Sequence, residues 1–231
     1  MSGDQLLYVQ PQHYPAVVTD RWGRFETTLI NDGQNFEMVL RGHRFGGSTV
    51  DGLELEESPA ESSQPPDMNH GDLCSCTIEW TMPVGITISG AEPVDAELHA
   101  RLRLGDPSPN NAIDHVGVTL ALQVLGGVVE TAEPRGWMEE ALSDLIRRLP
   151  DGIRLVACFS CALSDYHPGG SGFIGSMACF RDAKDTYRAV GSKRDLFKVW
   201  PHRSGFVQET FRCPEFAPRE RDAGYRGWPF G

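Results

Sequence analysis

Long apolar runs are absent from this 231-residue sequence. No stretch approaches the roughly 20 residues that a helix needs to span a membrane. The first residues contain an early acid and lack the apolar core of a secretory signal. Standard catalytic signatures are also absent, including the Walker loop, the dinucleotide-binding glycine pattern, the nucleophile elbow and the zinc-protease helix motif. These absences predict a cytoplasmic protein with no membrane segment and leave its activity open.

Lysine and arginine are absent from residues 45–100, whereas that segment holds eleven of the 32 acidic residues. The rest of the chain is balanced, with 21 acidic and 21 basic residues, so one segment carries the whole net charge of −11. This excess argues against binding to a nucleic-acid backbone, which needs basic side chains. It is typical of a solvated acidic surface, and it also fits an acidic face that docks a basic protein partner.

Apolar and polar residues alternate in three segments, at residues 74–82, 94–104 and 116–124. Each pattern predicts a strand with one buried face and one solvated face. Shorter apolar runs at 25–30 and 36–40 are separated by a turn signal and predict two more strands. The region near residues 57–71, rich in serine, proline and acid, predicts an exposed acidic loop.

A single helix is predicted after the strands, over residues 137–149. Its glutamates lie in the first turn and its arginines in the last, as the helix dipole favours. The predicted fold is therefore α+β, an antiparallel sheet or sandwich with one packed helix and a C-terminal zinc-knuckle region. We expect a mainly β domain over residues 1–135, and a second region over 136–231 that holds the helix, the knuckle and an extended arm. The apolar stripe of the helix consists of Met138, Ala141, Leu142, Leu145 and Leu149.

Six cysteines are too few for a small disulfide scaffold, and they are of two kinds. Cys74 and Cys76 share a predicted strand face with Ile78, Trp80 and Met82. Because residues two apart in a strand point the same way, we expect both to be buried thiols.

The other four cysteines lie in the C-terminal third: Cys158, Cys161, Cys179 and Cys213. The first two form a Cys-x-x-Cys, which can chelate a metal from one tight turn, and the last two can complete a tetrahedron of thiolates around zinc. Such a closed site would be structural and would tie the segment after the helix to the tail. Two alternatives remain open, namely unligated buried thiols and a redox-active Cys158/Cys161 pair. The redox pair lacks the expected βαβ context.

Polar residues surround the predicted knuckle and are the candidates for catalysis. Asp165 and His167 follow Cys161 in a glycine-rich stretch, and Glu209 lies four residues before Cys213. These three side chains could act as acid, base or ligand in an enzyme site beside the cysteines. The alternative is that Asp165 caps a turn and His167 lies on the surface.

Five short motifs occur in order along this third of the chain: Cys-x-x-Cys at 158–161, Ser-Asp-Tyr-x-Pro at 164–168, Cys-Phe-Arg at 179–181, Val-Gln-Glu-Thr-x-x-Cys-Pro-Glu-Phe at 207–216 and Gly-Tyr-Arg-Gly at 224–227. In these residues the chain resembles an uncharacterised family of bacterial proteins. The resemblance implies that the four cysteines act as one unit, and it implies no activity.

Together these features predict a zinc-stabilised bacterial interaction or accessory protein. It would contact a protein partner, or a second copy of itself, through its acidic face or through the aromatic arm at residues 214–231. The alternatives are a hydrolase-like enzyme with its site beside the cysteine cluster and, third, a thiol oxidoreductase.

Overall fold

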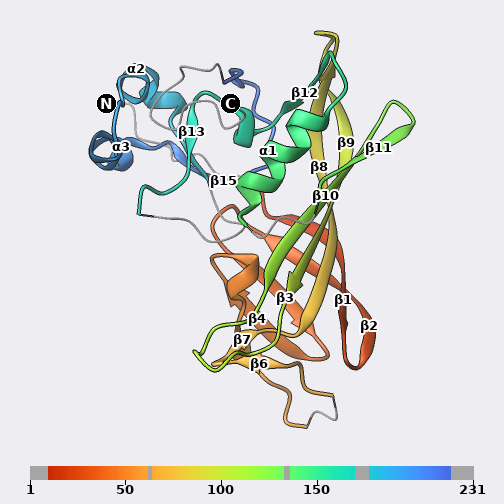
Figure 1. Cartoon of the computed structure of the whole chain (residues 1–231). Helices are drawn as coiled ribbons and strands as arrows, with labels where there is room; N and C mark the ends of the chain where they lie inside the picture. The colour runs from red at the N-terminus through yellow and green to blue at the C-terminus, as the bar shows by residue number, and fades with distance from the viewer. Residues whose placement is uncertain (1–9, 62–63, 133–135, 170–176, 220–231) are drawn as a thin grey trace.

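A computed structural model of the chain describes residues 10–61, 64–132, 136–169 and 177–219. In these residues a twelve-stranded antiparallel sheet forms the body of the molecule, and helix α1 (Met138–Arg148) packs against it. A three-stranded sheet and two short helices lie beside it (Figure 1). The protein is thus mostly antiparallel β with a few short helices, which agrees broadly with the predicted α+β class.

The strands of the large sheet follow the order β11-β10-β9-β8-β1-β2-β3-β4-β5-β7-β6, and β12 pairs with β8 outside this path. Their bounds are β1 Gln12–Asp20, β2 Gly23–Asn31, β3 Phe36–Leu40, β4 His43–Gly47, β5 Glu54–Glu57, β6 Met68–Asn69, β7 Asp72–Leu73, β8 Cys76–Ile88, β9 Val94–Leu104, β10 Val116–Val124, β11 Gly127–Glu130 and β12 Ile153–Val156.

The long strand β8 pairs with three other strands. It pairs with β9 along one edge from Cys76 to Ile86. Along its other edge it pairs first with β1, over Thr77–Trp80, and then with β12, over Gly85–Ile88. In the described register, residues 81–84 of β8 lie between these two partners and pair with neither of them. The sheet therefore opens at this point.

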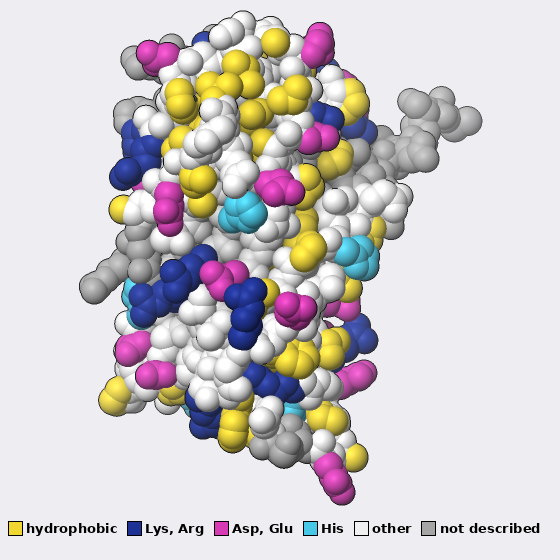
Figure 2. Space-filling model, turned by 90° about the vertical axis from the view of Figure 1, so that its right-hand side faces the viewer, with side chains coloured by type: hydrophobic (Ala, Val, Ile, Leu, Met, Phe, Trp, Pro, Cys, Tyr) yellow, Lys and Arg dark blue, Asp and Glu magenta, His cyan; other side chains and the backbone are white. Residues whose placement is uncertain are grey.

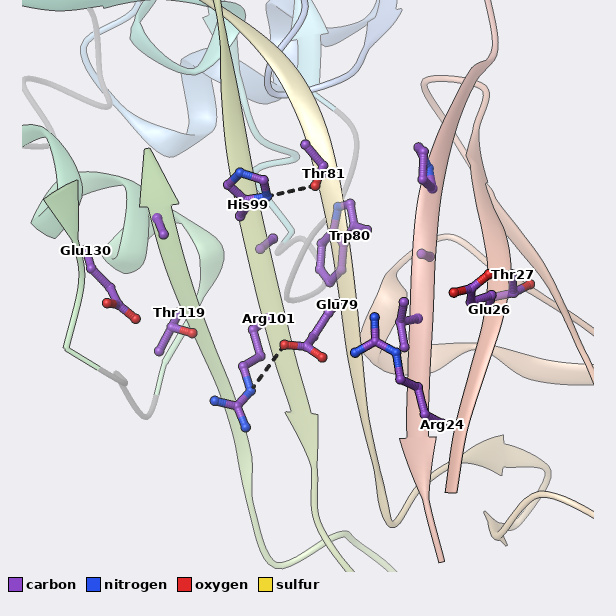
Figure 3. Close-up of a pocket in the computed structure, with 15 residues that line it drawn as sticks. Arg24, Glu26, Thr27, Glu79, Trp80, Thr81, His99, Arg101, Thr119 and Glu130 are labelled. Carbon is purple, nitrogen blue, oxygen red and sulfur yellow. Dashed lines mark hydrogen bonds and ion pairs between the residues drawn. The ribbon is translucent and has the colours of Figure 1, made fainter. Parts of the chain in front are cut away.

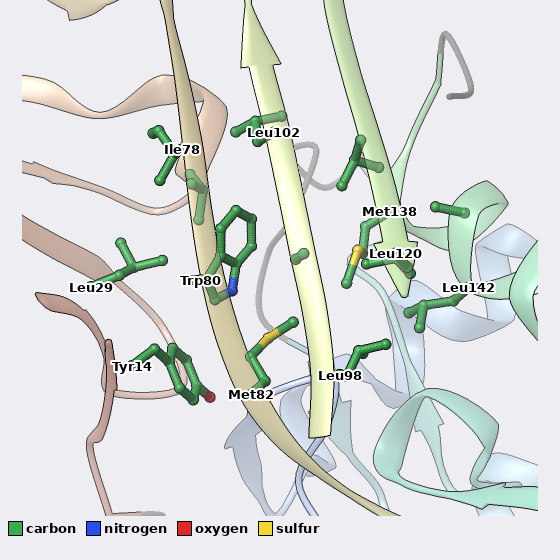
Figure 4. Packing of buried hydrophobic residues seen from close by; sticks show 14 of the residues in the cluster. Tyr14, Leu29, Ile78, Trp80, Met82, Leu98, Leu102, Leu120, Met138 and Leu142 are labelled. Atoms are coloured by element: carbon green, nitrogen blue, oxygen red, sulfur yellow. The ribbon is translucent and has the colours of Figure 1, made fainter. Parts of the chain in front are cut away.

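The core lies on one face of the large sheet, where the alternating patterns predicted it. Ile78, Trp80 and Met82 are all buried on β8. Figure 4 shows Met138 and Leu142 of α1 packed beside Leu120 of β10. Full burial of one such side chain contributes about 1.5–3 kcal/mol, so this face supplies much of the driving force for folding. The same core includes residues from both sides of the predicted domain boundary at residue 135.

The two cysteines of the first kind are buried, as predicted: Cys74 is 1% exposed and Cys76 is 6% exposed. Burial raises the pKa of the Cys76 thiol to about 12 from its ordinary 9.0, and nearby Asp20 adds to the rise. This thiol is therefore neutral in the folded protein at any physiological pH.

Cys76 should make the protein less stable in alkali. Because the folded-state pKa is the higher one, its contribution is complete below pH 9 and is lost as the pH rises toward 12. Between pH 8 and pH 10, we expect the titration of this thiol to lower the free energy of unfolding by about 1.4 kcal/mol. The measurement is denaturant unfolding at both pH values, with Cys76→Val as the matched variant. An equal loss in Cys76→Val would contradict this assignment.

The region after α1 holds more regular structure than the sequence predicts. Strands β13 (Ser164–Asp165), β14 (Met177–Cys179) and β15 (Gly205–Val207) form the small sheet, and helices α2 (Lys184–Arg188) and α3 (Lys193–Val199) pack beside it. Their apolar side chains form a second core, which includes Leu163, Phe180, Tyr187, Leu196 and Val199. The expectation of a single helix was therefore wrong. Elements of two to seven residues are too short to show a hydrophobic period.

Within the described residues, no helix is long and apolar enough to cross a membrane.

Candidate functional site

Backbone contacts gather the four C-terminal cysteines into one neighbourhood. The Cys158 N–H donates to the Phe211 carbonyl at 2.9 Å, two residues before Cys213. Cys179 pairs with Ser164 across the small sheet, three residues after Cys161. Segments that lie far apart in the sequence thus bring all four predicted zinc ligands to one place.

Three of the four sulfur atoms accept a backbone N–H from the residue two positions further along. Leu163 N lies 3.4 Å from Cys161 Sγ, and Glu215 N lies 3.3 Å from Cys213 Sγ. The N–H of Arg181 donates to Cys179 in the same way. Hydrogen bonds to an ionised acceptor are stronger than those between neutral groups, so this arrangement favours thiolates.

The cysteines also influence one another electrostatically. Burial raises the pKa of Cys158 well above its ordinary value, the charges of Cys161, Cys179 and Cys213 raise it further, and Arg181 opposes the rise. Burial likewise raises the pKa of Cys179 to about 11, although the N–H of Arg181 opposes it. Burial therefore favours the protonated form of the Cys158 and Cys179 thiols. Buried thiols of this kind are chemically inert, which disfavours the thiol oxidoreductase alternative.

Arg181 is a cationic side chain that contacts this cluster. Its Nη1 lies 3.9 Å from Cys213 Sγ, and its buried Nε has no hydrogen-bond partner among the described residues. The described residues contain no group of three or more His, Cys, Asp or Glu side chains arranged to hold a metal ion as they stand.

The three candidate catalytic residues contact different partners. The buried Glu209 accepts from the Tyr166 hydroxyl at 2.5 Å, whereas the buried Asp165 lies 3.0 Å from the Tyr187 hydroxyl. His167 is exposed and packs edge-on against Trp200, with ring centroids 4.8 Å apart. Each of these contacts joins one of the three side chains to a different neighbour, and the enzyme alternative stays a prediction.

A buried arginine beside the cysteines was not predicted. Arg219 is 2% exposed, and its Nε donates to the Cys161 carbonyl at 3.1 Å. Its Nη2 donates to the Ser164 carbonyl, and its own N–H donates to the Ser160 carbonyl at 3.0 Å. Arg219 thus satisfies backbone acceptors all along the Cys-x-x-Cys turn. No sequence signal distinguishes it from a surface arginine.

The outer face of the large sheet carries a groove of about 740 Å³, opposite the core. Cross-strand register aligns Glu26, Val17, Glu79, Arg101 and Thr119 in one row. Figure 3 shows Glu79 beside Arg101, with an Nε–Oε1 distance of 3.9 Å. Figure 2 shows basic and acidic side chains intermixed on the face seen from the right of Figure 1.

A second row of side chains in the groove contains Thr81, His99 and Glu130. His99 lies beside Thr81, with Nδ1 and Oγ1 2.8 Å apart, and Glu130 lies further along the row. The alternation in the sequence identified Thr81 and His99 as solvated. It did not reveal the groove, because that depends on which strands become neighbours.

The acidic segment is partly neutralised by arginines of the same chain. Asp67 pairs with Arg21 at 3.1 Å, and Glu56 pairs with Arg44 at 3.2 Å. A third pair joins Asp95 to Arg212 at 3.0 Å. The predicted acidic docking face therefore carries less unpaired charge than its composition suggests. Of the aromatic arm, residues 220–231 lie outside the described residues.

Comparison with known proteins identifies one family. The model of a family of unknown function, DUF6304, matches residues 12–164, well over half of the chain. The match includes the large sheet, α1 and the Cys-x-x-Cys turn, and it ends before Cys179. No curated protein matches the chain. No solved structure matches it either.

Proposed function

This chain belongs to the DUF6304 family of unknown function, and we propose that it is a zinc-stabilised bacterial interaction or accessory protein of the cytoplasm. Cys158, Cys161, Cys179 and Cys213 bind one structural zinc ion. The ion fixes the C-terminal segments beside the large sheet, whose outer groove contacts a protein partner. All six cysteines are free, which fits a reducing compartment.

The observation that carries this proposal is the set of N–H donors at the cysteines. Amide groups two residues ahead donate to three of the four sulfur atoms, and the guanidinium of Arg181 faces a thiolate position. Four thiolates around a divalent ion leave a net charge of −2, which such donors stabilise. A tetrahedral set of four sulfur ligands selects zinc or an iron–sulfur cluster. Metal analysis of protein purified without added metal tests the assignment, and one equivalent of zinc per chain is the expected result.

The groove is suited to a protein partner because its walls carry both signs of charge. Arg24 and Arg101 lie among Glu26, Glu79 and Glu130. A face that carries both signs is complementary to a copy of itself rotated by half a turn, so a second copy of the chain is the first partner to test.

Reversal of one groove charge should weaken this self-association. Arg101 is the basic side chain in the row that contains Glu79. Arg101→Glu would place a second negative charge beside Glu79 and would repel the acidic side chains of the opposing copy. We expect sedimentation equilibrium to show at least a tenfold weaker dimer, and high salt to weaken the wild-type dimer. Arg148→Glu on α1 is the matched control, since its side chain is half exposed away from the groove. Wild-type protein that stays monomeric at every concentration would contradict the self-association.

A further inference from the structure

A slit opens between β1 and β8 where the two strands stop pairing. In the described register they pair from Ala16 to Thr19 of β1. Continued by the same register, Pro15 would lie opposite Thr81, and Pro83 would lie opposite His13. Proline has no backbone N–H to offer a neighbouring strand, so the ladder is weakest here. Further along, β8 pairs with β12 instead.

Two hollows meet at this slit and share part of their lining. The outer hollow has a volume of about 640 Å³ and lies beside Pro15 and Thr81, which also line the groove. The inner hollow has a volume of about 230 Å³, and residues 208 and 210–212 form part of its lining. Tyr14 and Pro83 line both hollows, so the two hollows adjoin at the slit.

Two buried polar atoms at the inner hollow have no hydrogen-bond partner among the described residues: Tyr14 Oη and Gln208 Oε1. Each of the two residues is only 2% exposed. The Gln208 Nε2 donates to the Asn31 carbonyl at 3.0 Å, which leaves its oxygen as the free end of the amide. Buried polar groups are nearly always satisfied, so two such atoms at one small hollow point to a ligand.

The protonation of Tyr14 fixes the chemistry that it can offer. Burial raises the pKa of Tyr14 to about 12, and Thr210 lies close enough to oppose part of this rise. The hydroxyl therefore keeps its proton at neutral pH and can donate it. Gln208 Oε1 can only accept. One donor and one acceptor at the same hollow match the two ends of an amide group.

We propose that this slit binds an uncharged amide group. The Tyr14 hydroxyl donates to the carbonyl of the ligand, and Gln208 Oε1 accepts the ligand N–H. Val84 and Phe211 supply apolar lining, and the charged side chains among the described residues that line the inner hollow, Asp95 and Arg212, are paired with each other at 3.0 Å. This arrangement favours a neutral ligand over an ion. The proposal goes beyond the proposed function and requires neither the zinc ion nor the dimer.

Two sources of the amide are compatible with this chemistry. A carboxamide of a small molecule would fill the inner hollow alone. A peptide bond of an extended peptide would continue outward, because residues 12–15 of β1 and 81–84 of β8 are not paired with each other and present strand edges to the slit. The probes for these sources are acetamide and a blocked trialanine, N-acetylated and C-methylamidated.

The test is a titration of the full-length, metal-replete chain followed by two-dimensional NMR of its amide groups. We expect saturable shifts of the Gln208 side-chain amide and of the Tyr14 backbone amide with acetamide. Methyl acetate, which keeps the carbonyl but has no N–H, should bind at least tenfold more weakly, because it leaves Gln208 Oε1 unpaired. Tighter binding of blocked trialanine, with shifts along both strand edges, identifies the peptide source. Equal or weaker binding identifies the carboxamide source.

The matched variants remove one hydroxyl each. Tyr14→Phe should weaken acetamide about tenfold and change the thermal midpoint of the free protein little, because the lost hydroxyl makes no close hydrogen bond within the described part of the chain. Tyr187→Phe removes a hydroxyl that contacts Asp165 and Ser164, so it should lower the midpoint and leave the acetamide affinity unchanged. Shifts that do not saturate, or that acetamide and methyl acetate produce equally, would overturn the proposal, since the hollow would then be a water site.

Discussion

Removal of zinc with a strong chelator is expected to lower the unfolding free energy of the chain by about 4 kcal/mol. This is the stabilisation that a ligand gives when its free concentration is about a thousand times its dissociation constant. The physical reason is that the ion joins segments held by few other elements. Cys158 and Cys161 flank a short turn, Cys179 ends a three-residue strand, and Cys213 lies outside any helix or strand. Thermal unfolding with and without the chelator gives the measurement.

Two variants make this test specific for the cluster. Cys161→Ser removes one ligand, so its melting temperature should already be low and should not fall further with the chelator. Cys74→Ala changes a buried cysteine that is not one of the four ligands, so it should keep its zinc and its sensitivity to the chelator. Less than about half an equivalent of zinc per chain in the wild type, or iron in place of zinc, would contradict the zinc assignment.

Substitution of Arg219 by leucine is expected to cost about 3–5 kcal/mol of unfolding free energy. The leucine would remove one of the donors to each of the buried carbonyls of Cys161 and Ser164. It would also remove a positive charge near the buried Asp165 and Tyr187, where Arg219 lowers the pKa of the Tyr187 hydroxyl against a larger rise from burial. Urea unfolding followed by circular dichroism gives the value.

The matched control is Arg147→Leu on α1. The Arg147 side chain is 51% exposed, and its loss should change the stability by no more than about 0.5 kcal/mol. A loss below about 1 kcal/mol in Arg219→Leu would show that the buried guanidinium is not needed to hold the Cys-x-x-Cys turn.

Strands β8, β9 and β10 and the first helix were predictable because each shows its own period. The pattern at 94–104 has the same bounds as β9, and the pattern at 116–124 has the same bounds as β10. The predicted helix is longer than α1 by one residue at each end. In these segments the local pattern and the tertiary burial agree, so the sequence alone is sufficient.

The groove, the slit and the buried arginine were not predictable from local patterns. Glu79 and Arg101 become neighbours only when β8 pairs with β9. Pro15 and Pro83 each mark a weak point in one strand, but only the register places them at the same slit. Arg219 is buried by contacts 55 and 58 residues away in the sequence. Sites of this kind depend on long-range pairing, which no window of sequence contains.

The alternation along β8 also determines which parts of this protein can change independently. Ile78, Trp80 and Met82 face the core, whereas Glu79 and Thr81 face the groove. A shift of the β8 register by one residue would turn the core-facing residues outward and the groove-facing residues inward. Pairing with three neighbouring strands opposes such a shift. Substitutions at the odd-numbered positions can therefore alter the outer face of the sheet and leave the core unchanged.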